Sequence, residues 1–96
     1  MNNQFISIMR PGPNIKSGQH DELIGKHCDY LEEYFAKKVV IFAGPSWEQN
    51  EDHFAIVVLE TENKQEAQNI MNNNPAVAAG ILTSYITEFE VFLERK

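Results

Sequence analysis

The sequence predicts an α+β fold that is built from six elements in the order β-α-β-β-α-β. Short stretches of alternating or continuous apolar residues predict four strands. Two longer stretches, in which apolar residues recur every three or four positions, predict the two helices. The chain has 96 residues, of which 43% are hydrophobic, and this is enough for one core. We therefore expect residues 1–96 to form a single domain.

The first half of the chain predicts a strand, a helix and a second strand. Gln4–Arg10 alternates in the manner of a strand and ends at the turn Pro11-Gly12-Pro13. Asp21–Lys38 is the predicted first helix, because one stripe of side chains recurs at spacings of three and four. The residues of this stripe are Ile24, His27, Leu31 and Phe35. Val39–Ala43 is rich in β-branched residues and predicts a buried strand, which Gly44-Pro45 is expected to end.

The second half predicts a strand, a helix and a last strand. His53–Glu60 is the third strand, and Lys64–Asn73 is the second helix. The apolar residues expected on the inner face of that helix are Ala67, Ile70 and Met71. Asn74-Pro75 then begins a further helical turn, which Gly80 ends, and Ile81–Leu93 is a long last strand.

This order of elements is that of the ferredoxin-like fold, a four-stranded antiparallel sheet with two helices on one face. The other face is expected to need a cover as well, since apolar residues point both ways along two strands. In the third strand Phe54, Ile56 and Val58 oppose Ala55, Val57 and Leu59, and in the second Val39, Ile41 and Ala43 oppose Val40 and Phe42. A second copy of the same sheet is the simplest cover, so the sequence predicts a homodimer or a higher oligomer of dimers.

Composition excludes several classes of function. The net charge of −6 and a pI near 4.9 argue against binding to nucleic acid or to an anionic membrane surface. The longest apolar runs are far too short to span a bilayer, and the N-terminus lacks the pattern of a secretory signal. A single cysteine, Cys28, allows no internal disulfide. We expect a soluble cytoplasmic protein.

No cofactor or metal ion is predicted. His20 and His27 are seven residues apart, which is about 10 Å along a helix axis and too far for one shared ion. His53 has no evident partner in the sequence. Neither a glycine-rich phosphate loop nor a dinucleotide-binding fingerprint occurs.

His27 and Asn74 are the candidates for chemistry. His27 lies on the apolar stripe of the first helix, so its ring should point toward the sheet. It is either a structural histidine bonded to a backbone carbonyl or a group that faces a ligand, for which its ordinary pKa of about 6.5 suits proton transfer. Asn74 precedes Pro75 and is a typical N-cap, and its amide oxygen can also orient an imidazole N–H.

Three further residues are candidate ligand contacts. Ser46 and Trp47 follow the second strand, and they either close a hairpin over the edge of the core or form a polar contact and an aromatic wall of a pocket. Arg10, at the end of the first strand, is either solvated or placed to meet a carboxylate or phenolate in the same region. The loop Pro11–Lys16 is long enough to act as a lid.

Three separated pieces of the chain carry a resemblance to a known family. In order and separation, His27, Ala43-Gly44-Pro45 and Asn74–Gly80 resemble the YCII-related proteins, and the resemblance runs from the first strand to the last. It implies a dimeric α/β barrel in which two sheets face each other. It also implies an acid/base histidine at His27 and an aspartate at the position of Asn74, where this chain has lost the carboxylate.

Two classes of function follow from these residues. The resemblance implies a cofactor-independent enzyme that acts on a small, cyclic or aromatic organic molecule, with lyase, dehydrohalogenase or isomerase chemistry by proton transfer. His27 would then be the acid/base and Asn74 its orienter. The alternative is a non-catalytic ligand-binding or assembly domain that keeps the pocket without the catalytic aspartate. Replacing the aspartate of a catalytic triad by asparagine lowers kcat about 10⁴-fold in a well-studied case, and the sign of that effect favours the alternative.

Overall fold

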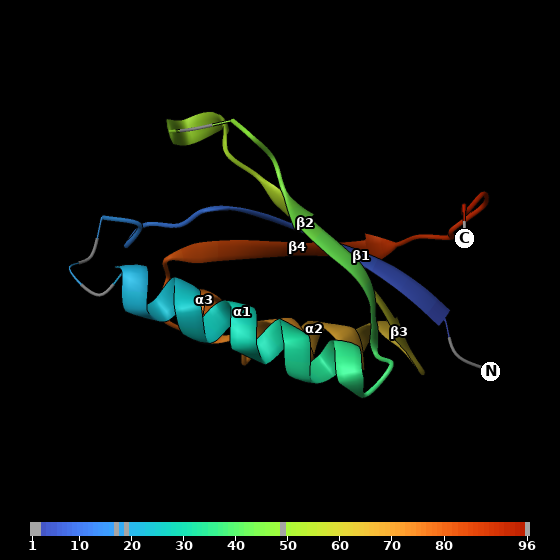
Figure 1. Cartoon of the computed structure of the whole chain (residues 1–96). Helices are drawn as coiled ribbons and strands as arrows, with labels where there is room; N and C mark the ends of the chain where they lie inside the picture. Colours follow the sequence, from blue (N-terminus) through green and yellow to red (C-terminus); the bar gives the residue numbers. More distant parts are fainter. Residues whose placement is uncertain (1–2, 17, 19, 49, 96) are drawn as a thin grey trace.

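The computed structural model describes residues 3–16, 18, 20–48 and 50–95. The chain forms one four-stranded sheet and several helices (Figure 1). The elements are β1 (Asn3–Pro11), α1 (His20–Ala36), β2 (Val40–Pro45), the short 3-10 helix η1 (Asn50–Asp52), β3 (Ala55–Thr61), α2 (Lys64–Asn72), α3 (Pro75–Ala78) and β4 (Leu82–Glu88).

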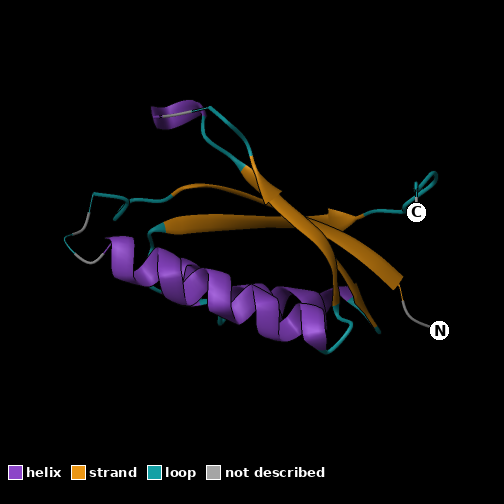
Figure 2. Cartoon of the chain, in the orientation of Figure 1, coloured by secondary structure: helices purple, strands orange, loops and turns teal. Residues whose placement is uncertain are grey.

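The sheet is antiparallel throughout, with the strand order β2-β3-β1-β4. The helices α1, α2 and α3 lie on one side of it, and the β2–β3 hairpin projects away from them (Figure 2). The predicted α+β, ferredoxin-like fold is therefore confirmed.

The core lies between the sheet and the helices. Phe5 and Met9 of β1 pair with Leu59 and Ala55 of β3, and this register turns the odd-numbered residues of both strands toward the helices. Ser7 shares this side, and its hydroxyl lies 2.6 Å from the hydroxyl of Ser84 on β4. From the helices, the fully buried residues that meet this face are Ala67, Met71 and Ala76. The inner face predicted for α2 is confirmed at Ala67 and Met71, which are both fully buried.

The opposite face of the sheet is apolar and no helix of the described chain covers it (Figure 2). At its centre two isoleucines of β1 pair with residues of β3: Ile6 pairs with Val58, and Ile8 pairs with Ile56. Around them Phe42, Tyr85 and Phe54 are 40%, 64% and 38% exposed. We call this surface the open face. Its composition agrees with the prediction that both faces of the sheet need a cover.

Helix α1 is shorter than predicted, because it ends at Ala36 instead of Lys38. Lys38 takes a positive φ of 67° and its N–H bonds Phe35 O, while the N–H of Val39 bonds Tyr34 O. These two bonds form a Schellman motif, which closes a helix through a left-handed residue. Phe35 lies at this terminus and is 60% exposed, so its predicted place on the buried stripe was wrong.

Strand β2 differs from the prediction in its length and its faces. The prediction that Gly44-Pro45 ends the strand was wrong. The strand continues through both residues, and Pro45 pairs with Ala55. A proline is tolerated there because β2 is an edge strand. A register shift between Val40 and Phe42 interrupts the alternation, so Val40 and Ala43 share the helix side while Phe42 turns to the open face.

The last strand also ends early, at Glu88 instead of Leu93. Glu88 pairs with Phe5, close to the start of β1, and only the N–H of Phe89 still bonds a β1 carbonyl, that of Gln4. In this register Asn3, the first described residue of β1, faces Glu90, so a strand that continued to Leu93 would have no described partner in β1 for its last residues.

Candidate functional site

His27 and Asn74 meet where α1 packs against the start of α3. The Nδ1 atom of His27 lies 2.9 Å from Oδ1 of Asn74. His27 is 8% exposed and Asn74 is fully buried. Asn74 is also the N-cap of α3, as predicted, because the same Oδ1 accepts the N–H of Ala76 at 3.0 Å and Pro75 follows at the first helical position. Capping therefore fixes the side chain that meets the histidine.

This arrangement assigns the proton positions of the pair. A backbone N–H can only donate, so the Asn74 atom that faces Ala76 must be the amide oxygen. An amide oxygen can only accept, so Nδ1 of His27 carries the hydrogen that bonds it. In its neutral form the ring then keeps a free lone pair on Nε2. His27 is thus held in the tautomer that a base acting through Nε2 requires.

The other half of the Asn74 amide has no such partner. Its Nδ2 atom is buried and makes no hydrogen bond to any residue that the structure describes. An unpaired buried donor is unfavourable by about 1–3 kcal/mol. Asn74 therefore orients His27 through one atom, but it brings no negative charge that would stabilise the protonated ring.

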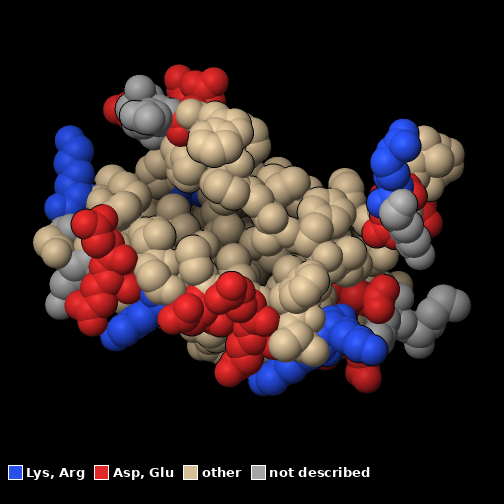
Figure 3. Space-filling model, in the orientation of Figure 1, with Lys and Arg blue, Asp and Glu red and all other residues tan. Residues whose placement is uncertain are grey.

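A cavity of about 560 Å³ adjoins His27. Its floor is apolar and comes from Met9, Ala55 and Val57, while α1 and the end of β2 supply the walls. The wall residues from these two elements include Ile24, Leu31, Ala43, Gly44 and Pro45. Figure 3 shows a hollow between the β2–β3 hairpin and α1, with acidic side chains along the exposed side of α1. His27 and the segment Ala43-Gly44-Pro45, far apart in the sequence, thus border one space.

The predicted ligand contacts from the hairpin lie beside this cavity. Ser46 and Trp47 line a neighbouring hollow of about 430 Å³, which shares Pro45 and His53 with the first. The hydroxyl of Ser46 accepts the N–H of Phe54 at 3.1 Å and so closes the hairpin, while Trp47 is fully exposed. Both interpretations of these residues therefore remain predictions.

Arg10 and the expected lid segment are placed differently. Arg10 is exposed near the end of β1 and is not among the described residues that line either cavity. The beginning of the β1–α1 loop is tied down, because the N–H groups of Gly12 and Asn14 bond the carbonyls of Ile81 and Gly80 at 2.8 and 2.9 Å. These bonds hold this part of the loop in place against Gly80 and Ile81.

Sequence reasoning missed the convergence of the histidines. His20 and His53 line the same cavity as His27. The spacing of seven residues was a usable signal for His20, because positions seven apart lie on one face of a helix. His53 joins them only through the pairing of β2 with β3, which carries the residues before Ala55 to the cavity.

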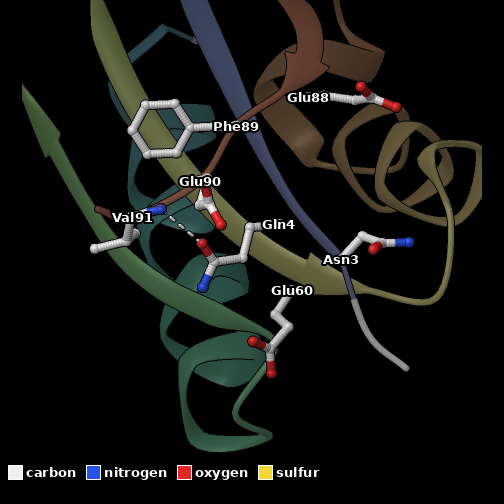
Figure 4. Close-up of a pocket in the computed structure, with 7 residues that line it drawn as sticks. All are labelled: Asn3, Gln4, Glu60, Glu88, Phe89, Glu90 and Val91. Carbon is white, nitrogen blue, oxygen red and sulfur yellow. Dashed lines mark hydrogen bonds between the residues drawn. The ribbon is translucent and has the colours of Figure 1, made fainter. Parts of the chain in front are cut away.

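A third hollow, of about 730 Å³, lies at the other end of the sheet. Figure 4 shows its lining, in which Gln4 Oε1 accepts the N–H of Val91 at 2.8 Å. Its charged groups are the carboxylates of Glu60, Glu88 and Glu90, and no described lining residue is basic or nucleophilic. It therefore offers no acid–base pair.

The fold clearly shifts the pKa of Tyr30. Its hydroxyl donates to the carbonyl of Ile70 at 2.8 Å, and its ring lies 5.0 Å from that of Tyr34. Burial raises the pKa of the Tyr30 hydroxyl above its usual value, and the neighbouring Tyr34 and Glu33 raise it further. Tyr30 is thus a neutral donor that fastens α1 to the end of α2.

The described residues contain no group of three or more His, Cys, Asp and Glu side chains that is arranged to hold a metal ion. They also contain no helix that is long and apolar enough to cross a membrane.

Comparison with known proteins decides the family. The sequence matches the YCII-related domain over residues 4–90, which is nearly the whole chain. The chain belongs to this family. No match to a curated protein sequence was found.

Solved structures of several other proteins share this fold. One is the 5-chloro-2-hydroxyhydroquinone dehydrochlorinase of Burkholderia phenoliruptrix AC1100 in complex with 2,5-dihydroxybenzoquinone, at 18% identity, a TM-score of 0.64 and coverage of 90% of this chain and 93% of that one. An uncharacterized protein of Thermotoga maritima has 8% identity and a TM-score of 0.61, covering 94% and 100%. A dimeric ferredoxin-like protein from an uncultured marine organism has 13% identity and a TM-score of 0.50, covering 100% and 95%.

Proposed function

We propose that this YCII-related protein is a small-molecule enzyme in which His27 transfers a proton through its Nε2 atom. The observation that carries the proposal is the hydrogen bond from Nδ1 of His27 to Oδ1 of Asn74 beside a cavity of about 560 Å³. It leaves Nε2 of the neutral ring unprotonated, which is the state that a general base needs. The likeness in fold to a dehydrochlorinase supports lyase, dehydrohalogenase or isomerase chemistry.

In such a reaction His27 Nε2 takes a proton from the substrate, and the electron pair of the broken bond forms a new double bond. In an elimination the leaving group departs from the adjacent atom. In an isomerisation the imidazolium returns the proton to another atom of the substrate. Asn74 acts as a positioning residue, since it holds the ring in one tautomer and one orientation. The apolar floor of the cavity offers the ring of the substrate a hydrocarbon surface.

The second candidate is a non-catalytic ligand-binding or assembly domain. The observation that favours it is the uncharged amide of Asn74, which stands where the family resemblance implies an aspartate. Without a carboxylate the charge that forms on His27 during proton transfer has no counter-ion in the pair. The open face adds to this candidate, because a surface of Ile8, Ile56 and Tyr85 suits self-association.

We propose the same open face as the interface of a homodimer. Its centre is apolar, and Tyr85 is 64% exposed without a covering layer. A solved protein of similar fold, at 13% identity, is described as a dimeric ferredoxin-like protein, which supports this assembly. Dimerisation would bury aromatic and β-branched side chains, which is the usual driving force for such interfaces.

A substrate screen with two variants tests the catalytic proposal. Halogenated and hydroxylated ring compounds would be incubated with the protein, and halide release and ultraviolet spectra would report turnover. His27→Gln should abolish any turnover, because glutamine cannot accept a proton at neutral pH. Gly25→Ala, at an exposed position of α1 with open space around it, is the matched control and should keep it. Turnover that survives His27→Gln would exclude His27 as the base.

A further inference from the structure

The cavity at His27 gathers every histidine of the chain. The sequence contains three histidines, and His20, His27 and His53 all line this one space. His20 begins α1, His27 follows two turns later, and His53 lies between η1 and β3. Their convergence comes from three different parts of the fold and is not explained by the proton transfer proposed for His27 alone.

Each of these rings uses its Nδ1 atom to donate. Nδ1 of His53 lies 3.0 Å from the carbonyl oxygen of Glu48, and Nδ1 of His20 lies 3.3 Å from a carboxylate oxygen of Asp21. With Asn74 Oδ1 at His27, all three partners are oxygens that can only accept. In the neutral form each Nδ1 therefore carries the hydrogen, and each Nε2 keeps its lone pair for another partner.

The rest of the lining contains almost no side-chain hydrogen-bond donor. None of the described residues around the cavity is Lys, Arg, Ser, Thr, Tyr, Asn or Gln. Glu32 adds a carboxylate, which accepts, and Cys28 adds only the weak donor of a thiol. The floor and walls are otherwise apolar. A ligand of this space thus meets acceptors at a few points and hydrocarbon elsewhere.

We propose that the cavity selects uncharged ring compounds that carry hydroxyl groups at two separate positions. One hydroxyl donates to Nε2 of His27, and the other donates to Nε2 of His53 across the cavity. His53 is then a second ligand-binding residue, held in its tautomer by the loop carbonyl of Glu48. The inference rests on the proposed function in placing the ligand at His27, and it adds the chemical class of that ligand.

The same lining disfavours anionic ligands. A carboxylate or phosphate would need donors or a positive charge, and the lone pairs of the neutral rings and the Glu32 carboxylate would repel it. The Arg10 guanidinium, which would suit such a ligand, is not among the described lining residues. Arg10 led us to expect a carboxylate or phenolate ligand, and the lining of the cavity indicates the opposite selectivity.

A graded series of probes tests the ligand class. Hydroquinone, 4-methoxyphenol, 1,4-dimethoxybenzene and benzoate would be titrated into the protein at about pH 8 in oxygen-free buffer, with NMR of the histidine rings as the readout. Each replaced hydroxyl hydrogen should weaken binding about 3- to 10-fold, which corresponds to one lost hydrogen bond. Benzoate should bind least. Equal binding of the dimethoxy compound, stronger binding of benzoate, or no binding of hydroquinone at millimolar concentration would overturn the proposal.

Two variants of His53 distinguish the role of its Nδ1 atom from that of its Nε2 atom. In His53→Asn the amide N–H can replace Nδ1–H as donor to Glu48, and the acceptor at Nε2 is lost. Hydroquinone and 4-methoxyphenol should then bind this variant equally. His53→Gln places an amide near the position of Nε2 and should keep part of the difference. If both variants discriminate as the wild type does, His53 does not bind the second hydroxyl.

The ring nitrogens also give a test that needs no ligand. Nitrogen-15 shifts at about pH 8 distinguish the two neutral tautomers, and Nε2 of His53 should be the unprotonated atom. A hydrogen on Nε2 would overturn the proposal. Failure of the proposed function looks different: hydroquinone would bind in the expected pattern while no compound is turned over. Conversely, turnover of compounds with a single hydroxyl at full affinity would leave His27 as the base and remove His53 from the site.

Discussion

Nδ1 of His27 donates to Oδ1 of Asn74 over 2.9 Å, from a ring that is 8% exposed to an amide that is fully buried. The same oxygen caps α3 by accepting the N–H of Ala76. One atom of Asn74 therefore begins a helix and sets the tautomer of the candidate base. Because capping alone favours Asn and Asp about equally, the exchange of one for the other changes the electrostatics of His27 with little change in local structure.

Asn74→Asp tests this relationship. The new carboxylate keeps both hydrogen bonds of Oδ1, and its second oxygen takes the buried place of the unpaired Nδ2. A buried carboxylate favours a charged imidazole, so the titration midpoint of the His27 ring should be higher in the variant than in the wild type, measured by NMR. If the protein is a weakened catalyst, the activity found by screening should rise; if it is a binding domain, only the titration will move.

The stability of this variant should depend on pH. When the folded midpoint of a histidine is raised above its unfolded value of about 6.5, the added stability is complete below that pH and is lost as pH rises through the folded midpoint. In urea melts the stability of Asn74→Asp relative to the wild type should thus fall as pH rises above about 6.5. Asn63→Asp is the matched control, because Asn63 is the exposed N-cap of α2. A ring that titrates identically in wild type and Asn74→Asp would mean that the two side chains are not neighbours in solution.

The sequence predicted the fold because its elements carry local signals. Asn74-Pro75 and Gly80 marked the ends of α3 correctly, with Gly80 at a positive φ of 77°. The errors lie where tertiary context overrides a local rule. Pro45 is accommodated because its strand lies at the edge of the sheet, and α1 closes on Lys38 where a glycine would be the usual signal.

Of the candidate site, only the pair of His27 and Asn74 could be predicted from the sequence. The contact between His27 and Asn74 followed from the family resemblance, which places these positions together. The places of His20 and His53 depend on the hairpin register and on the packing of α1, which no local pattern encodes. The tautomers depend on single hydrogen-bond partners such as the carbonyl of Glu48 and cannot be inferred before the fold is known.

The open face should make the protein a dimer near micromolar concentration, measured by light scattering after size exclusion. Tyr85→Glu places a charge on this face at a side chain that is 64% exposed, so it should dissociate the dimer without unfolding the protomer. Phe35→Glu alters an aromatic residue of similar exposure, 60%, on the helix side and should leave association unchanged. A monomeric wild type with a cooperative unfolding transition would exclude the barrel arrangement.

Two glycines should respond to alanine in opposite directions. A Cβ atom at Gly12 would collide with the carbonyl oxygen of Gly80, at the place where the β1–α1 loop is bonded to Ile81. Gly12→Ala should therefore lower the free energy of unfolding by about 1–3 kcal/mol. Gly25 has nothing within 4 Å of its Cβ position, so Gly25→Ala should raise it by about 0.5–1 kcal/mol through helix propensity. Urea denaturation of both variants measures the difference, and a neutral Gly12→Ala would contradict the close approach of the two backbones.

The protein should lose stability at alkaline pH because the hydroxyl of Tyr30 resists ionisation in the folded state. Burial, with the neighbouring Tyr34 and Glu33, raises the pKa of its hydroxyl in the folded state above the unfolded value of about 10. The contribution of the neutral hydroxyl is complete below about pH 10 and is lost as pH rises further, because the unfolded chain then ionises while the folded one resists.

Tyr30→Phe should remove this alkaline loss, at a constant cost of about 0.5–1.5 kcal/mol for the hydrogen bond to the carbonyl of Ile70. Urea melts between about pH 8 and pH 11 measure both proteins. If Tyr30→Phe loses stability above pH 10 as steeply as the wild type, the buried hydroxyl is not the group that resists ionisation.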